Sequence, residues 1–175
     1  MDLWHEFQSL FDSNDGSLPE IDIENVSPAG LARMWTYLRT IASDYAGDAW
    51  FWDKRNDRQT GLDSVPNPAA LVVAGEAEIF HTVLQGITFF GTVIPDLGVF
   101  VFQDAISLDY RMGGDWNAAK VSALFELLRQ LQRIDSNAQI SLSKTYFSSD
   151  WRERFTAAFT RYVQQLGQLD REPSG

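Results

Sequence analysis

Apolar residues recur at two spacings along the chain, and the first spacing predicts four helices. Steps of three and four positions, typical of one helical face, occur near both ends and in two internal stretches. Asp2, Ser27 and Asp115 precede three of these stretches and are expected to cap them, with Pro28 at a first helical position. The fourth helix is expected to open in residues 148–151. The apolar faces comprise Leu3, Phe7, Leu10 and Phe11; Leu31, Met34, Trp35, Leu38, Ile41 and Ala42; Val121, Leu124, Phe125, Leu128, Leu131 and Ile134; and Trp151, Phe155, Phe159, Tyr162 and Leu166.

The second spacing alternates apolar and polar positions and predicts strands, mainly between the second and third helices. In residues 105–111, the side chains at 106, 108 and 110 are apolar, and Ser107, Asp109 and Arg111 point the other way. We expect the apolar side to be buried and the polar side to be solvated, as in an antiparallel sheet. The expected strands are 77–85, 87–94, 98–103 and 105–111, with shorter ones at 20–26, 49–52, 70–74 and 139–143.

The order of these elements predicts the fold class. Gly86 and residues 95–98 read as tight turns, which favour antiparallel neighbours, because parallel strands need crossover connections. The sequence therefore predicts a two-layer α+β fold, an antiparallel meander of about four to six strands with about four helices mainly on one face. We expect a single domain spanning residues 1–175, with roughly the last six residues disordered. Residues 53–68 are interpreted as a long polar loop.

The charge of the chain is uneven. The formal net charge is −10, yet the residues from Arg33 onward hold 17 acids against 14 bases. The seven acids before Arg33 are Asp2, Glu6, Asp12, Asp15, Glu20, Asp22 and Glu24. Such a field repels nucleic acid and anionic membranes and attracts cationic proteins. The alternative interpretation is a solvated acidic surface that serves only solubility.

Composition also bears on compartment and chemistry. The absence of cysteine excludes disulfides, thiolate zinc sites and cysteine nucleophiles, and it fits a reducing compartment. The acidic start of the chain does not resemble a secretory signal. The longest apolar runs, such as residues 97–102, are too short for a membrane helix. We therefore expect a soluble, cytoplasmic protein that does not enter a membrane.

Known metal and nucleophile motifs do not fit. An EF-hand counted from Asp12 would place Gly16 at the fifth position and Ile23 at the twelfth, so the calcium register fails. A zincin-like start at His5 lacks its second histidine, since Ser9 stands there. We expect no metal, no cofactor and no catalytic residue, and the chain is more consistent with a non-enzyme than with an enzyme.

The segment AWFWDKRNDR, residues 49–58, places aromatic residues beside cations. Aromatic rings stack on bases and cations bind phosphates, but Asp53 and Asp57 interleave and the whole chain is acidic, so we expect no nucleic acid. Alternation requires at least one large ring of this segment to face the core, and we favour the core for its tryptophans. An exposed Trp50 or Trp52 would instead suit a protein interface.

Two functional hypotheses follow. The first is a small non-enzymatic binding protein, most concretely an immunity or antitoxin-like inhibitor, that docks a basic protein partner through its acidic N-terminal face. The expected partner-binding residues are Asp12, Asp15, Glu20, Asp22, Glu24, Trp50, Trp52 and Arg55. The second is a small-ligand-binding protein or enzyme with a site near the 53–68 loop or the 110–116 turn. Its candidate residues are Asp53, Asp57, Asp63, Arg55 and His81. The sequence does not determine the oligomeric state.

Overall fold

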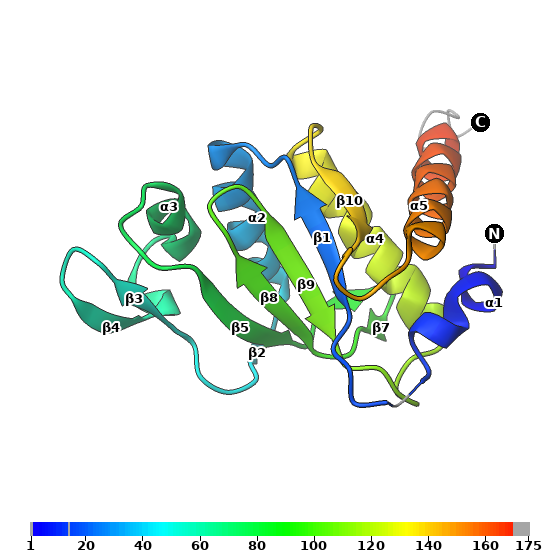
Figure 1. The fold of residues 1–175 in the computed structure, drawn as a ribbon, viewed down its shortest axis with the longest axis horizontal. Coiled ribbons are helices and arrows are strands. Elements are labelled where there is room, and N and C mark those ends of the chain that lie inside the picture. Colours follow the sequence, from blue (N-terminus) through cyan, green and yellow to red (C-terminus); the bar gives the residue numbers. More distant parts are fainter. Residues whose placement is uncertain (1, 14, 170–175) are drawn as a thin grey trace.

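A computed structural model describes residues 2–13 and 15–169, and its centre is a six-stranded antiparallel sheet (Figure 1). The strand order is β10–β1–β9–β8–β5–β2, so the expected meander is present as β5, β8 and β9, with β1 added beside β9. The strands are β1 (Glu20–Glu24), β2 (Asp44–Tyr45), β5 (Phe80–Gln85), β8 (Leu97–Val101), β9 (Ile106–Tyr110) and β10 (Gln139–Leu142).

Helices form the second layer. The long helices α2 (Pro28–Ile41) and α4 (Ala118–Ile134) run behind the sheet in Figure 1, and α5 (Ser149–Leu169) packs against α4 and β10. The short helices α1 (Leu3–Phe7) and α3 (Pro68–Val73) contact α4 and α2 respectively. The prediction of a two-layer α+β fold with an antiparallel sheet is confirmed.

Local capping explains where the long helices begin, and it corrects one expectation. The Ser27 side chain accepts from the Gly30 N–H, and Pro28 occupies the first turn, as the sequence indicates. Asp115 does not cap α4, because the chain first turns with the Trp116 N–H bonded to the Gly113 carbonyl. The cap is Asn117, whose side chain accepts from the Lys120 N–H at 3.1 Å.

Three further segments differ from the sequence-based expectation. Residues 70–73 belong to helix α3 and Ala74 is its C-cap, so this segment is not a strand: Asn67 caps the helix and Pro68 starts it, and a short apolar run does not distinguish helix from strand. Residues 87–94 form a small hairpin of β6 (Thr88–Phe89) and β7 (Thr92–Val93). The presumed loop 53–68 contains the end of β3 (Trp50–Asp53), strand β4 (Arg58–Gly61) and a 3₁₀ turn at Leu62–Ser64.

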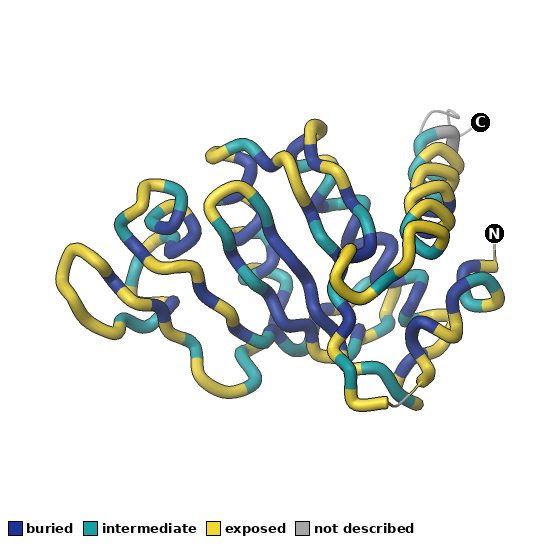
Figure 2. The backbone as a smooth tube through the Cα atoms, viewed as in Figure 1, coloured by how far each residue is buried: buried dark blue, intermediate teal, exposed yellow. Residues whose placement is uncertain are grey.

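The core lies between the sheet and the helical layer. Ile21 and Ile23 of β1 are fully buried, as are Leu31 of α2 and Leu124 of α4. Figure 2 shows the central strands and the sheet-facing sides of the helices in the buried colour. Burial of this apolar surface is the main stabilising contribution to the fold.

Strand β9 is buried on both faces, which corrects the expectation of a solvated polar side. Ser107 is 4% exposed and Asp109 is 7% exposed. The reason is position: β9 is a central strand, so side chains of β1 and β8 lie on either side of its polar residues. Its two polar groups are therefore hydrogen-bonded rather than solvated.

Two remaining expectations concern membranes and the C-terminus. Within the described residues, no helix combines the length and the apolar character needed to cross a bilayer. The expectation of disorder for roughly the last six residues concerns positions 170–175, which lie outside the described residues.

Candidate functional site

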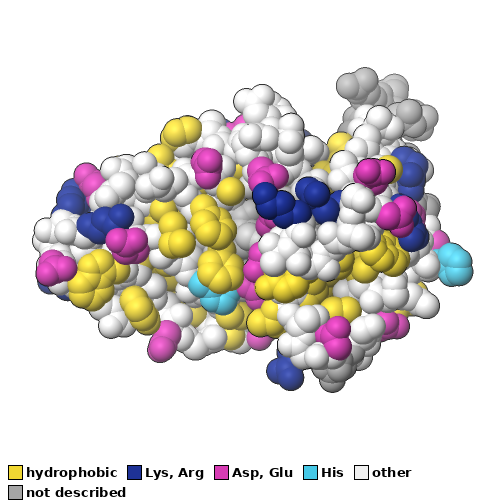
Figure 3. Space-filling model, in the orientation of Figure 1, with side chains coloured by type: hydrophobic (Ala, Val, Ile, Leu, Met, Phe, Trp, Pro, Cys, Tyr) yellow, Lys and Arg dark blue, Asp and Glu magenta, His cyan; other side chains and the backbone are white. Residues whose placement is uncertain are grey.

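The sheet face opposite α2 and α4 carries a row of carboxylates. Alternation along β1 sends Ile21 and Ile23 into the core, so Glu20, Asp22 and Glu24 project from the other face. The register places Glu20 opposite Asp109 of β9. We call Glu20, Asp22, Glu24 and Asp109 the acidic face. Figure 3 shows carboxylates on this side of the molecule between two areas of apolar side chains.

Asp109 is held by a histidine two strands away. Its Oδ2 accepts a hydrogen bond from Nε2 of His81 on β5 at 2.7 Å. The strand between them, β8, has Gly98 opposite Asp109, and a methyl group there would occupy the position of the carboxylate. Phe100 of β8 lies against the imidazole, with ring centroids 4.2 Å apart. The pair therefore depends on a glycine that leaves room for it.

Glu20 is the carboxylate of β1 whose ionisation is opposed by its surroundings. Burial, together with the neighbouring charges of Asp22 and Asp109, raises the pKa of Glu20 above its usual value. The Ser107 hydroxyl donates to Asp22 Oδ1 at 2.8 Å and partly offsets the repulsion. Among the described residues, no lysine or arginine forms an ion pair with Glu20, Asp22 or Glu24. The three carboxylates of β1 therefore lack an ion-pair partner among these residues, whereas Asp109 is paired with His81.

A hollow of about 270 Å³ adjoins these carboxylates. Glu20, Asp22 and Glu24 form one wall, and the ring of Phe102 forms another. Lys144 also lines it. Carboxylates beside an aromatic ring suit a guanidinium or an ammonium group, which is attracted by both.

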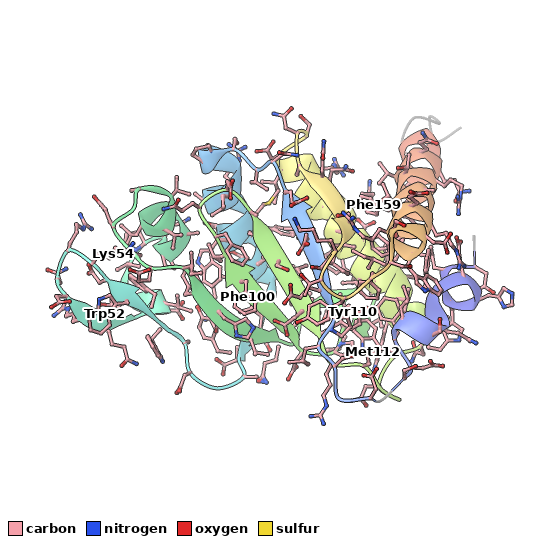
Figure 4. The ribbon with its side chains drawn as sticks, viewed as in Figure 1. Trp52, Lys54, Phe100, Tyr110, Met112 and Phe159 are labelled. Carbon is pink, nitrogen blue, oxygen red and sulfur yellow. The ribbon has the colours of Figure 1, made fainter. Side chains whose placement is uncertain are left out.

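The two tryptophans of β3 are exposed, contrary to the interpretation we favoured from sequence. Phe51 alone faces the core, at 1% exposure, whereas Trp50 and Trp52 are 42% and 40% exposed. Figure 4 shows Trp52 on the β3–β4 hairpin and Phe100 on the central sheet. A hollow of about 500 Å³ beside these tryptophans is also lined by His81, so it borders the acidic face.

The other predicted acids lie away from β1. Asp12 and Asp15 are exposed on the connection into β1, where Asp15 accepts from the backbone and hydroxyl of Ser17. The Ser17 hydroxyl bond, followed by its amide bond, lowers the pKa of Asp15. Asp2 caps α1, and Glu6 pairs with Arg161 at 3.3 Å. The structure therefore divides the seven N-terminal acids among different settings.

The residues named for the alternative site do not converge. Asp53 accepts from the amides of Arg55 and Asn56, and bonds from the Asn56 side chain first of all lower its pKa. Asp63 accepts from Arg39 and Tyr45 instead.

The two remaining residues of that set also lie apart. Arg55 pairs with Glu76 at 3.3 Å, and Asp57 is exposed in the hairpin turn. Only His81 of the five reaches the acidic face. The 110–116 turn is occupied by structural bonds: Tyr110 donates to the Leu10 carbonyl, and Trp116 Nε1 donates to the Arg111 carbonyl.

Sequence reasoning missed Asp109 and Gly98 as site residues. The alternation of residues 105–111 places Asp109 on the polar side, but nothing local indicates that β1 is its neighbour. The face offers carboxylates and one imidazole; no serine or threonine hydroxyl of the described residues bonds to that imidazole. Within the described part of the chain, no group of three or more His, Cys, Asp or Glu residues could hold a metal ion.

Comparison with known proteins adds no relative: no family model, no curated protein and no solved structure matches the chain.

Proposed function

We propose that this chain is a small binding protein that docks a cationic protein partner across the acidic face. The observation that carries the proposal is that Glu20, Asp22 and Glu24, which are half-buried or exposed, share one side of β1 and form no ion pair among the described residues. Keeping like charges adjacent on one strand is costly for the free protein, because like charges repel. A cationic partner would remove that cost on binding.

Aromatic residues near the carboxylates supply the buried contacts that charge alone does not provide. Complementary charge speeds encounter, up to ~10⁸–10⁹ M⁻¹s⁻¹ at low salt, but long residence needs buried anchors. Phe102 lies beside the carboxylates of β1, and the exposed Trp50 and Trp52 line the separate hollow that His81 also lines. Tryptophan and tyrosine are the residues most often found to dominate binding energy. The surface therefore combines a steering field with anchors.

The most concrete form of this proposal is an immunity or antitoxin-like inhibitor. Such a protein would cover a cationic catalytic surface, such as that of a nuclease, and would need no catalytic group of its own. Arg55, which the sequence places among the expected partner-binding residues, forms an ion pair with Glu76 and has a smaller role in this form of the proposal.

The test compares two triple variants of equal charge change. Glu20→Gln/Asp22→Asn/Glu24→Gln removes three carboxylates from the acidic face. Asp57→Asn/Asp96→Asn/Asp115→Asn removes three exposed ones elsewhere. Proteins captured from host extract by the parent chain are identified, and their association rates are measured between low and high salt.

The expected partner is basic, is inhibited or masked by the parent chain, and associates more slowly as salt rises. The acidic-face variant should lose at least about tenfold in affinity, because several charge-assisted contacts disappear. The control variant should stay within about twofold, since exposed surface charges contribute little. An acidic partner, or equal losses in both variants, overturns the proposal.

One observation favours the alternative of a small-ligand protein or enzyme. The His81–Asp109 pair lies beside the hollow of about 500 Å³, and an imidazole oriented by a carboxylate is a common acid–base arrangement. The remaining candidate residues, Asp53 and Asp63, are engaged in other contacts. If the His81→Gln variant binds the partner with full affinity, His81 is not needed for docking. Ligand screening then tests this alternative.

A further inference from the structure

Strand β5 is paired along only part of its outer edge. At one end, the Ala46 N–H donates to the Val83 carbonyl at 2.8 Å. At the other, the Glu78 N–H donates to the Trp52 carbonyl at 3.0 Å. Between these two points no backbone hydrogen bond of the described residues joins residues 47–51 to β5, although the Thr82 hydroxyl of β5 donates to the Asp48 carbonyl at 3.5 Å; a hollow of about 500 Å³ opens there. We call this opening the edge slot.

The cause of the opening is a break in pairing register. The Ala46–Val83 pair and the Trp52–Glu78 pair differ in register by one residue, so one extra residue must be absorbed between them. Gly47, with φ of 107°, provides the left-handed conformation where the segment diverges. In Figure 1 the connection from β2 to β3 bows outward at this point.

The edge slot exposes backbone hydrogen-bonding groups. The carbonyls of Val83 and Gln85 accept from the β2 side, from Ala46 and Ser43. Because main-chain groups alternate in direction along a strand, the N–H and C=O of His81 point to that same side. No backbone hydrogen bond of the described residues fills this position. It is an unpaired strand edge, which can accept another extended segment.

Side chains around the edge slot give it a chemical preference. Trp50, Trp52 and Ile79 line it and are exposed enough to contact an occupant. Asp48 and Glu78 line it as well. Glu78 forms an ion pair with Lys54, with Oε1 and Nζ 3.2 Å apart, whereas Asp48 has no ion pair among the described residues. Aromatic rings with nearby carboxylates favour arginine or lysine over acidic side chains.

We propose that the edge slot receives an extended, arginine- or lysine-bearing segment of the cationic partner, which pairs its main chain with His81 of β5. One side chain of the segment packs on Trp50 and Trp52, and a neighbouring cation lies near Asp48. The segment continues toward the acidic face, which His81 borders through Asp109. This inference rests on the proposed function and adds its mode of binding.

The test uses a blocked pentapeptide in which arginine and valine alternate, so that no unidentified partner is needed. Binding is followed by backbone amide shifts and by hydrogen exchange at His81. A second peptide carries an N-methyl group at its central amide, and a third has serine in place of arginine. Loss of one backbone hydrogen bond should weaken binding about fivefold.

Two protein variants separate the slot from general surface effects. Trp50→Ala/Trp52→Ala should weaken binding fivefold or more, whereas Phe90→Ala/Tyr146→Ala, which removes two exposed rings elsewhere, should not. Slower hydrogen exchange at the His81 amide in the presence of the parent peptide supports the edge slot. Equal binding of the N-methylated peptide, or no effect of the tryptophan changes, overturns it.

The outcomes also distinguish this inference from the proposed function. Loss of peptide binding in the Glu20→Gln/Asp22→Asn/Glu24→Gln variant alone, with the tryptophan variant unchanged, overturns the slot and keeps the acidic face. If the serine peptide binds as tightly as the arginine peptide, the preference for a cationic partner is overturned, and the edge slot remains a site for extended segments. No binding of any peptide to the parent chain overturns the slot.

Discussion

Nε2 of His81 lies 2.7 Å from Oδ2 of Asp109, although a whole strand separates the two residues. The contact passes over Gly98 of β8, the register partner of both Asp109 and Val83. A side chain at position 98 would fill the space through which the carboxylate reaches the imidazole. Asp109 is thereby tied to β5 as well as opposed to Glu20 on β1. This one contact links the acidic face to the edge slot.

Gly98→Ala should separate this pair. The backbone at Gly98 is not left-handed, so alanine is accepted there, and the clash falls on the Asp109 carboxylate. We expect the protein to fold with a loss on the order of 2 kcal/mol and without the His81 Nε2–H resonance of a hydrogen-bonded imidazole. Urea unfolding and imidazole NMR measure the two effects. Gly114→Ala is the control, since a methyl there meets nothing within 4 Å. An unchanged imidazole signal contradicts the relationship.

Glu20→Gln should stabilise the free protein while weakening partner binding. Burial, then the charges of Asp22 and Asp109, raise the pKa of Glu20 in the folded state. A raised carboxyl pKa means that folding opposes ionisation, so stability declines as pH rises from the unfolded value of about 4.3 through the folded one. At neutral pH the amide removes this cost. The gain in unfolding free energy should be under about 1 kcal/mol, measured by urea titration.

The pH dependence of the same variant checks the mechanism. The difference in stability between parent and Glu20→Gln should shrink as pH falls below about 4, because the parent glutamate is then protonated. A variant less stable than the parent at neutral pH would show that Glu20 makes a stabilising contact instead.

Asp135 should contribute stability that disappears in acid. Its carboxylate accepts from the hydroxyl and the amide of Ser27, and these bonds lower its pKa; it also accepts from the Asn137 amide. A lowered folded pKa gives stability that is present above the unfolded value of about 3.9 and is lost as pH falls through the folded one. Asp135→Asn should cost on the order of 2 kcal/mol at pH 7.

The cost of Asp135→Asn should be smaller near pH 2 than at pH 7, as measured by urea unfolding at the two values. The control is Asp57→Asn, at an exposed position with a φ of 48° that asparagine tolerates. A cost of Asp135→Asn that does not change with pH would mean that the shape of the side chain matters, and not its charge.

Phe90→Asn should raise stability. Phe90 is 74% exposed and has a φ of 52°, followed by Gly91 at 71°, which together make the β6–β7 turn. Two left-handed residues suit a type I′ turn, for which Asn-Gly is the preferred pair. The change relieves strain of roughly 1 kcal/mol and removes little buried surface.

Thermal unfolding compares Phe90→Asn with Val93→Thr, a second exposed residue of the same hairpin that has ordinary strand geometry. A higher melting temperature is expected for the first variant only. A lower one would indicate that the Phe90 ring packs against its own chain.

The fold class followed from local patterns because periodicity reports which side of an element is buried. Period two marked residues 105–111 as a strand, and steps of three and four marked α2, α4 and α5. The pattern failed where it was shortest. Residues 70–74 carry a run of apolar residues that suits a helix as well as a strand, and Asn67 and Pro68 decided for the helix.

Local sequence patterns predicted only part of the candidate site. Alternation in EIDIE by itself determined that Glu20, Asp22 and Glu24 share one side of a strand, since side chains alternate every residue. Tertiary structure alone decided that β9 lies beside β1, that Asp109 joins that side, and that Glu6 is neutralised by Arg161. The physical reason is that alternation is a property of one strand, whereas strand order and ion pairs depend on residues far apart in the chain.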